Sequence, residues 1–246
     1  MKKGTQQDYS TLPTNDDAPS PVADPSSPSL IVTTTKCDHV SLSWHIAHVA
    51  GFFTGGLAFI IGTACLFYPA WDNGALVSAW LYIIGSFGFF GVDFLEFFTF
   101  TQSGTLRANI GISMFGSFLY ILGSVGFLPS VASSIEWIGP WGFILGSVFI
   151  ASSELWKLYR IGGGESAGGF LFATLTESKD TATQVGVEGG AFLGAAFFFV
   201  GTVLYDVGDM TRVKALDRVL ALWTCGSVAF FIGSFFLGYR HFVMKL

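Results

Sequence analysis

The sequence is poor in charged residues. Asp, Glu, Lys and Arg make up 12% of its 246 residues, whereas 51% are hydrophobic and 27 are Phe. A soluble domain uses about 25% charged residues, so this composition excludes an ordinary soluble domain. The surplus hydrophobic surface must face lipid, and the sequence therefore predicts a multi-pass membrane protein with the lipid bilayer as its first partner.

Several signs of chemistry are also missing. The three cysteines share no C-x-x-C spacing, and neither an H-E-x-x-H zinc motif nor a phosphate-binding loop with its Lys is present. No basic run that would follow a phosphate backbone occurs, so nucleic acid is not expected as a partner. From these absences we expect no enzyme activity, no cofactor and no resident metal.

Residues 1–42 form a segment of their own. Five Pro residues lie there among Ser, Thr and Asp, with few hydrophobic residues to bury. Such a composition predicts a disordered tail, which we place in the cytoplasm. The stretch 9–12 fits the Tyr-x-x-apolar pattern of endocytic sorting signals, which is compatible with location in the plasma membrane or an endolysosomal membrane. The sequence does not predict which membrane it is.

Six hydrophobic runs follow the tail, and each is long enough to cross a hydrocarbon core of about 30 Å as a helix. They are 45–68, 76–100, 109–131, 137–159, 187–205 and 219–243. Their continuous hydrophobicity excludes the alternating strands of a membrane barrel. We expect an all-α polytopic domain over 43–246, made of hairpins at about 45–100, 109–160 and 187–243, with a cytoplasmic connector at 161–186.

Basic residues predict the orientation of these helices. With both termini on one side, that side carries nine of the 12 Lys and Arg residues, and the other side carries only Arg212, Lys214 and Arg218. Positive charge is retained in the cytoplasm during insertion. Both termini are therefore expected to be cytoplasmic.

One nine-residue pattern recurs in all six runs: a small residue, an aromatic ring four positions later, then Gly and a hydroxyl residue. Its copies start at 55, 78, 116, 139, 194 and 226, so a single shift of 61 relates the first two hairpins, while the third has a wider separation of 32. Small residues let helices approach closely in lipid. The packing glycines are Gly55, Gly62, Gly85, Gly116, Gly123, Gly139, Gly146, Gly194, Gly201, Gly226 and Gly233.

Two of these copies, 79–86 (AWLYIIGS) and 140–147 (PWGFILGS), resemble the Trp-x-aromatic-apolar-apolar-Gly-Ser signature of YrhK-like membrane proteins. The resemblance implies tandem two-helix hairpins over about 46–243. It is weaker in the third hairpin, where Val228 replaces the Trp. The family implies no established activity and no catalytic residues.

Superposing the copies places Asp93, Glu154 and His241 at equivalent positions, on the face where the first helix begins with His45 and His48. Imidazoles and carboxylates inside a span are typical of proton or cation sites. The alternative is that these side chains reach the headgroups and water. A metal site that adds Cys37, Asp38 and His39 to the two histidines is a further alternative, which we do not adopt.

Two functions therefore remain open from the sequence. The first is a structural or interaction role in the membrane, with a homo-oligomer or another membrane protein as partner. The alternative is a transporter or channel for protons, a cation or a small solute, which would use the polar ring near the cytoplasmic face.

Overall fold

The computed structural model describes residues 41–68, 72–100, 104–161, 178–208 and 213–244, and all of them belong to one compact unit. The long helices are α1 (Leu42–Leu66), α2 (Gly74–Thr99), α3 (Gly104–Gly126), α5 (Ile138–Ile161), α7 (Lys179–Val207) and α8 (Val213–Gly238). The short α4 (Pro129–Ala132) lies between α3 and α5, and α8 continues into a π-helix, η2 (Tyr239–Val243). These ranges contain no strand.

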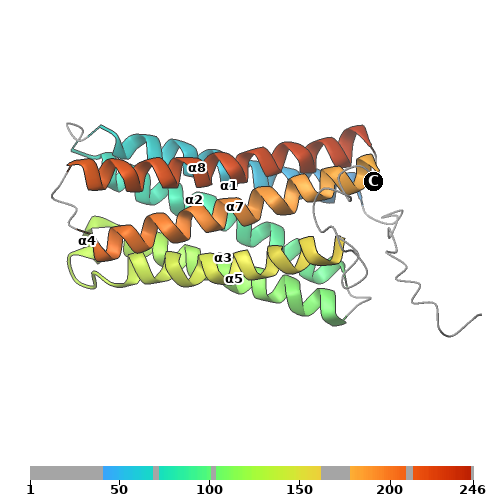
Figure 1. Ribbon diagram of the computed structural model, residues 1–246, viewed down its shortest axis with the longest axis horizontal. Coiled ribbons are helices and arrows are strands. Elements are labelled where there is room, and N and C mark those ends of the chain that lie inside the picture. The colour runs from blue at the N-terminus through green and yellow to red at the C-terminus, as the bar shows by residue number, and fades with distance from the viewer. Residues whose placement is uncertain (1–40, 69–71, 101–103, 162–177, 209–212, 245–246) are drawn as a thin grey trace, which may run out of the picture. The chain divides into compact units, whose positions relative to one another are not determined.

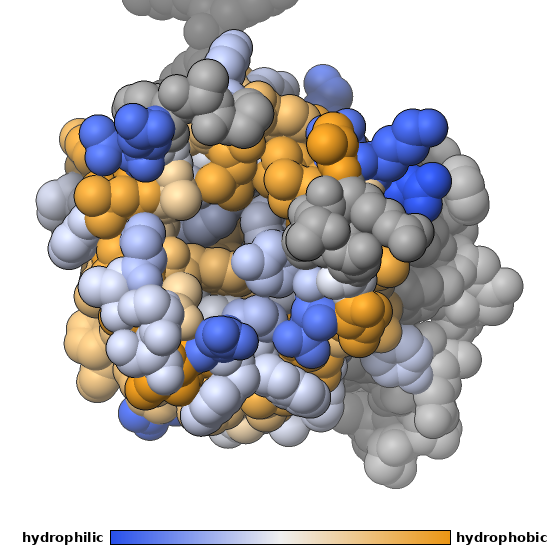
Figure 2. Space-filling view, turned by 90° about the vertical axis from the view of Figure 1, so that its left-hand side faces the viewer, coloured by the Kyte–Doolittle hydropathy of each residue, from blue (hydrophilic) through white to orange (hydrophobic). Residues whose placement is uncertain are grey.

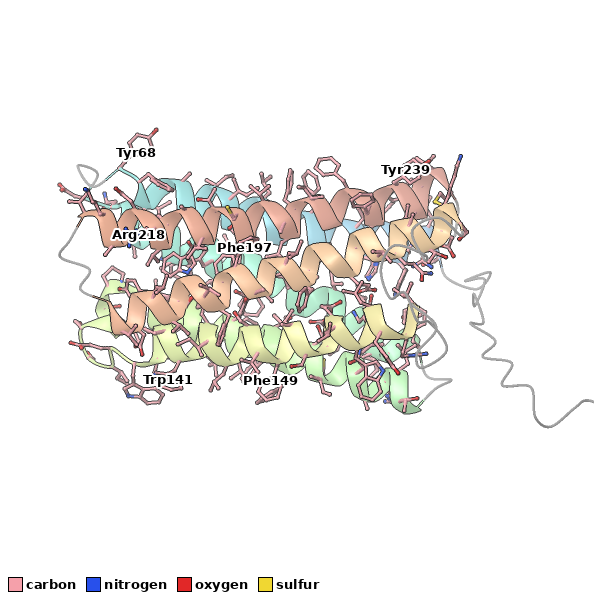
Figure 3. All side chains as sticks on the ribbon, viewed as in Figure 1. Tyr68, Trp141, Phe149, Phe197, Arg218 and Tyr239 are labelled. Atoms are coloured by element: carbon pink, nitrogen blue, oxygen red, sulfur yellow. The ribbon has the colours of Figure 1, made fainter. Side chains whose placement is uncertain are left out.

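Six helices of this structure are long and apolar enough to cross a membrane. Their outer faces carry large hydrophobic side chains, such as Phe87 and Phe98 on α2, which are 56% and 59% exposed. Figure 3 shows Trp141 and Phe149 pointing outward from α5 in the same way. The all-α fold expected from the sequence is confirmed, and the chain has the architecture of a multi-pass integral membrane protein.

Three helices begin at least five residues earlier than the hydropathy pattern indicates. α7 begins at Lys179, inside the segment expected to be a connector, α8 begins at Val213 instead of 219, and α3 begins at Gly104 instead of 109. Ser178 caps α7, because its side chain accepts a hydrogen bond from the Thr181 N–H. The first turns of all three helices carry polar residues, so a search for hydrophobic runs finds only their later parts.

The six long helices form a closed ring in which each packs against two neighbours (Figure 1). The hairpins are α1 with α2, α3 with α5 and α7 with α8, and contacts of α2 with α3, α5 with α7 and α8 with α1 join them. The starts of α1, α3 and α7 therefore meet the ends of α2, α5 and α8 at one end of the ring. Figure 2 views the opposite end, which carries α4 and where hydrophilic and hydrophobic residues are mixed.

One aromatic ring from each long helix fills the centre of this arrangement. The six rings, which we call the aromatic layer, belong to Phe59, Tyr82, Tyr120, Phe143, Phe198 and Trp223, and none is more than 4% exposed. The Phe59 ring centroid lies 4.9 Å from that of Tyr82 and 5.2 Å from that of Phe198. Rings at these separations attract one another beyond their burial, so the layer closes the middle of the bundle.

Glycines let the paired helices approach the aromatic layer. A Cβ atom on Gly146 would lie 2.5 Å from the Tyr120 ring, and one on Gly226 would lie 2.7 Å from the Phe198 ring. Gly85 faces Phe59 in the same way, so each hairpin has a glycine of its second helix against a ring of its first. The other predicted packing glycines also lie within 3.4 Å, measured from a built Cβ, of another segment: Gly55, Gly62, Gly116, Gly123, Gly139, Gly194, Gly201 and Gly233.

The third hairpin packs in a different register from the one that the motif copies predict. The prediction makes Phe230 the counterpart of Tyr82, but it is Trp223 that packs against Gly201, as Tyr82 packs against Gly62. Phe230 instead faces Gly194. Residues 222–227 (LWTCGS) offer a ring followed by Gly-Ser at the same spacing, so the sequence fits two registers, seven residues or about two helical turns apart.

We expect Gly142→Ala to destabilise the bundle by about 1–3 kcal/mol, the usual cost of overpacking. A Cβ at this position would lie 2.5 Å from the Gly123 Cα, which is backbone and cannot turn away. Unfolding of the purified protein in detergent measures the loss. Gly91→Ala is the matched control, because nothing lies within 4 Å of its Cβ position; an equal loss for both variants would contradict the packing.

Candidate functional site

Buried polar side chains gather at the end of the bundle where α1 begins and η2 ends. Every long helix contributes to this polar end except α8, whose contribution comes from η2. The ionisable members are His45, His48, Asp93, Glu96, Glu154, Lys157, Glu188 and His241, and the neutral ones are Asn109, Ser113, Ser117 and Ser153. Ionisable groups at such positions must satisfy one another, because lipid offers them no partners.

Three imidazoles and a carboxylate form a chain of hydrogen bonds. His45 Nδ1 lies 3.0 Å from His241 Nδ1, and His241 Nε2 lies 3.1 Å from His48 Nδ1. His48 Nε2 lies 3.0 Å from Glu96 Oε1. His45 is partly exposed, whereas His48 is only 3% exposed. The histidine chain, as we call these four residues, therefore leads from the partly exposed His45 through the buried His48 to the half-buried Glu96, whose side chain is 19% exposed.

The direction of donation in this chain follows from an ionised Glu96. Its carboxylate accepts from the His48 Nε2–H, so a neutral His48 must accept at Nδ1 from the His241 Nε2–H. A neutral His241 then accepts at Nδ1 from the His45 Nδ1–H. All three contacts are satisfied by neutral rings that donate towards Glu96.

The surroundings hold these rings in place. The Trp44 ring stacks on His48 with centroids 4.5 Å apart, and its Nε1–H donates to Thr99 Oγ1 at 2.9 Å. His241 lies in η2, next to Arg240, whose Nε–H donates to Asp180 Oδ1 of α7 at 3.1 Å. A π-helix turn is often found at functional sites. In this one, His241 contacts α1 and the adjacent Arg240 contacts α7.

A second group of charges surrounds Lys157. Its ammonium donates to Glu154 Oε1 at 3.0 Å and contacts Glu188 Oε2 at 3.2 Å. Asp93 and Glu96 of α2 also act on it electrostatically. The lysine cluster thus holds four carboxyl groups around one ammonium, and two of them, Glu154 and Glu188, lie within hydrogen-bonding reach of each other, which requires a proton between them.

Neutral side chains complete part of the polar end. Ser117 Oγ donates to Asp93 Oδ2 at 2.5 Å. Asn109 and Ser153 join α3 to α5, because Asn109 Nδ2 donates to the Ser153 carbonyl at 3.3 Å and Ser153 Oγ donates to the Asn109 carbonyl at 3.1 Å. Two buried acceptor atoms have no hydrogen-bond partner there, Asn109 Oδ1 and Glu154 Oε2.

Towards the opposite end, the buried polar groups are hydroxyls bonded to one another around the aromatic layer. Thr63 Oγ1 lies 2.8 Å from the Tyr82 hydroxyl, and Ser86 Oγ lies 3.0 Å from Ser124 Oγ. The Trp223 Nε1–H donates to a threonine hydroxyl of α7 at 3.1 Å. These hydroxyl contacts link adjacent helices close to the aromatic layer.

The structure places the sequence-predicted candidates in two groups. His45, His48 and His241 lie together in the histidine chain, while Asp93 and Glu154 belong to the lysine cluster. In the observed register of the third hairpin, Ser234 lies eight residues after Gly226, as Asp93 lies eight after Gly85. His241 therefore reaches the polar end from further along its helix than the motif superposition indicates.

Three ionisable members of the polar end, Glu96, Lys157 and Glu188, are not among the candidate site residues, although the sequence places them at a similar depth in the membrane. Glu96 and Lys157 each follow a candidate acidic residue by three positions and so share its helix face. Glu188 lies at the start of the predicted run 187–205, and the structure has it within α7.

The histidines form a chain and not a metal-binding cluster. His241 contacts His45 and His48 through opposite nitrogens, and one metal ion cannot use both nitrogens of one ring. Within the described ranges, no group of three or more His, Cys, Asp or Glu side chains is arranged to hold a metal ion. Cys37, Asp38 and His39 lie outside those ranges. Residues 164–168, which match the Gly-x-Ser-x-Gly pattern, lie outside them as well.

Comparison with known proteins adds no family: no family model, no curated protein and no solved structure matches the chain. Function must therefore be argued from the polar end itself.

Lys157→Met should destabilise the protein by roughly 3 kcal/mol or more, because breaking a buried ion pair leaves unpaired charge behind. Unfolding in detergent measures the change. The matched control is Lys179→Met at the exposed start of α7, which we expect to stay within about 0.5 kcal/mol of the parent.

Combining Lys157→Met with Glu154→Gln should cost less than the sum of the two single changes, because the two side chains are bonded. Additive losses, or equal losses for Lys157→Met and Lys179→Met, would contradict a charge-balanced cluster.

Proposed function

We propose that this protein is a proton transporter of the membrane. The observation that carries the proposal is the histidine chain, which leads from the partly exposed His45 through the buried His48 to the half-buried Glu96, beside the carboxyl groups around Lys157. Ionisable residues inside spans are costly and are typical of proton relays and ion pathways. A purely structural bundle has no need of a directed chain of imidazoles.

A proton crosses the chain in three transfers. Protonation of His45 at Nε2 makes an imidazolium, which releases its Nδ1 proton to His241 Nδ1. His241 passes its Nε2 proton to His48 Nδ1, and His48 passes its Nε2 proton to Glu96 Oε1. Glu96 is then neutral, one proton has left the water, and His241 and His48 donate in the reverse direction, so the rings must turn over before the chain can carry another proton towards Glu96.

Proton uptake also balances the polar end. Four carboxyl groups face one ammonium, so protonation of the imidazoles adds positive charge beside an acidic cluster. Two neighbouring imidazolium rings, however, point N–H groups at each other, so their contact must open. Uptake of more than one proton would therefore move His241 and η2 away from α1, which is the kind of two-state element that transport requires.

We infer that the three hairpins are copies of one YrhK-like unit and that both termini are cytoplasmic. The recurrent pairing of a glycine with a ring in each hairpin supports the first inference, and the excess of Lys and Arg on the tail side supports the second. The polar end would then open to the cytoplasm. The aromatic layer would close the path to the other side until the bundle changes conformation.

The second candidate is a structural or interaction protein without catalysis, whose partner is a further copy or another membrane protein. The aromatic layer favours it, because six packed rings fill the middle of the bundle. This candidate predicts that the protein moves no protons.

Proton movement into liposomes tests the two candidates. The full chain is reconstituted with a pH-sensitive dye inside, Na⁺ and K⁺ in both solutions, and a K⁺ diffusion potential as the driving force. We expect a protein-dependent pH change whose rate falls at least about tenfold in His241→Phe, because loss of one relay group costs on the order of 10²-fold in proton transfer.

The control is Tyr239→Phe, a change in an exposed side chain of the same element, which Figure 3 shows at the polar end. It should transport at the parental rate. If the unchanged protein moves protons no faster than empty liposomes do, the proposal is overturned and the structural candidate is favoured. Equal rates of proton movement in His241→Phe and Tyr239→Phe would exclude the histidine chain as the route.

A further inference from the structure

Lys157 occupies a position that a free cation could take. Its ammonium is held between Glu154 and Glu188 at 3.0 and 3.2 Å, with a side chain only 15% exposed. Glu188 also lies within hydrogen-bonding reach of Glu154. Two carboxyl groups can be joined by a hydrogen bond only while they share a proton, so with that proton and the Lys157 ammonium the charges of this sector between α5 and α7 are balanced, and a cation that binds here must replace the proton.

Unsatisfied oxygens mark where such a cation would bind. Glu154 is 3% exposed and Asn109 is 2% exposed, yet Glu154 Oε2 and Asn109 Oδ1 have no hydrogen-bond partner. Asn109 is bonded to α5 at Ser153, the residue next to Glu154. A buried acceptor without a donor costs about 1–3 kcal/mol. Asn109 Oδ1 can only accept, and Glu154 Oε2 becomes an acceptor when Glu154 gives up its proton, so a cation that replaces the proton would provide a partner for both atoms.

The chemistry of these atoms selects the class of cation. Carboxylate and amide oxygens are hard ligands, which suit alkali and alkaline-earth ions better than zinc or copper. Replacing one proton by one cation keeps the charges balanced only when the cation is monovalent. The imidazoles of the histidine chain are engaged with one another and with Glu96, so they are not needed as ligands.

We propose that Glu154, Glu188 and Asn109 bind a small alkali cation, with Na⁺ as the probe ion, and that Lys157 occupies part of this site in its absence. The inference rests on the proposed function, because it names the second substrate of the transporter. Protons arrive through the histidine chain, and the cation binds in the neighbouring sector between α3, α5 and α7.

Thermal unfolding of the full chain in detergent tests cation binding directly. It is compared in NaCl, KCl and choline chloride at equal ionic strength and at one pH, so that screening is constant. We expect a saturable rise in Tm with Na⁺ or K⁺ over choline, since a ligand that binds only the folded state stabilises it. Glu154→Gln should weaken the apparent affinity at least about tenfold, because a charged ligand is lost.

Two further variants keep the test independent of folding defects. Asn109→Leu removes a neutral ligand and should also weaken the cation effect, whereas Glu136→Gln alters an exposed carboxylate at the other end of the bundle and should leave it unchanged. Lys157→Gln removes the tethered ammonium and should tighten cation binding.

The outcomes separate this inference from the proposed function. Equal Tm values in all three salts, or equal cation effects in Glu154→Gln and Glu136→Gln, would overturn the cation site. Proton movement in choline buffers would in that case leave the transporter proposal standing. Absence of proton movement in every salt would overturn the proposed function, whatever the Tm values show.

Discussion

The balance of charge inside the bundle is the constraint on which the rest of this structure depends. A buried carboxylate is tolerated when a donor or a cation satisfies it. Lys157 does so for Glu154 and Glu188, and His48 does so for Glu96. The polar end holds more carboxyl groups than ammonium groups, so protons or cations from the water complete its charge. The polar end is therefore the part of the molecule that responds to its surroundings.

The aromatic layer, in contrast to the polar end, makes the middle of the bundle rigid. Its rings pack against glycines of the paired helix so closely that no Cβ fits between them, and such close packing has few alternative arrangements. The aromatic layer is therefore the rigid region of the bundle, and the polar end is the region that exchanges protons. η2 lies at the point where they could be coupled, because its π-helical turn holds His241 on α1 while Arg240 holds α7.

Hydropathy was sufficient to predict the all-α fold and the six spans, since each apolar run became one helix. The third hairpin shows where local pattern fails: glycines seven residues apart fit two registers, and only packing against Phe198 and Gly201 selects the one with Trp223 inside. The site was predictable in its residue types but not in its partners. His45 and His241 are 196 residues apart, and they meet because the ring of helices closes between α8 and α1.

The central claim is that the three imidazoles act as one directed chain. Nitrogen-15 NMR of the ¹⁵N-histidine-labelled protein in lipid bilayers tests it most directly, because a hydrogen bond between two ring nitrogens gives a measurable coupling across the bond. The account predicts two such couplings at neutral pH, His45 to His241 and His241 to His48, both lost when His241 is replaced by Phe. It also predicts that acidification abolishes both together. Three histidines that show no coupling and titrate independently would contradict it.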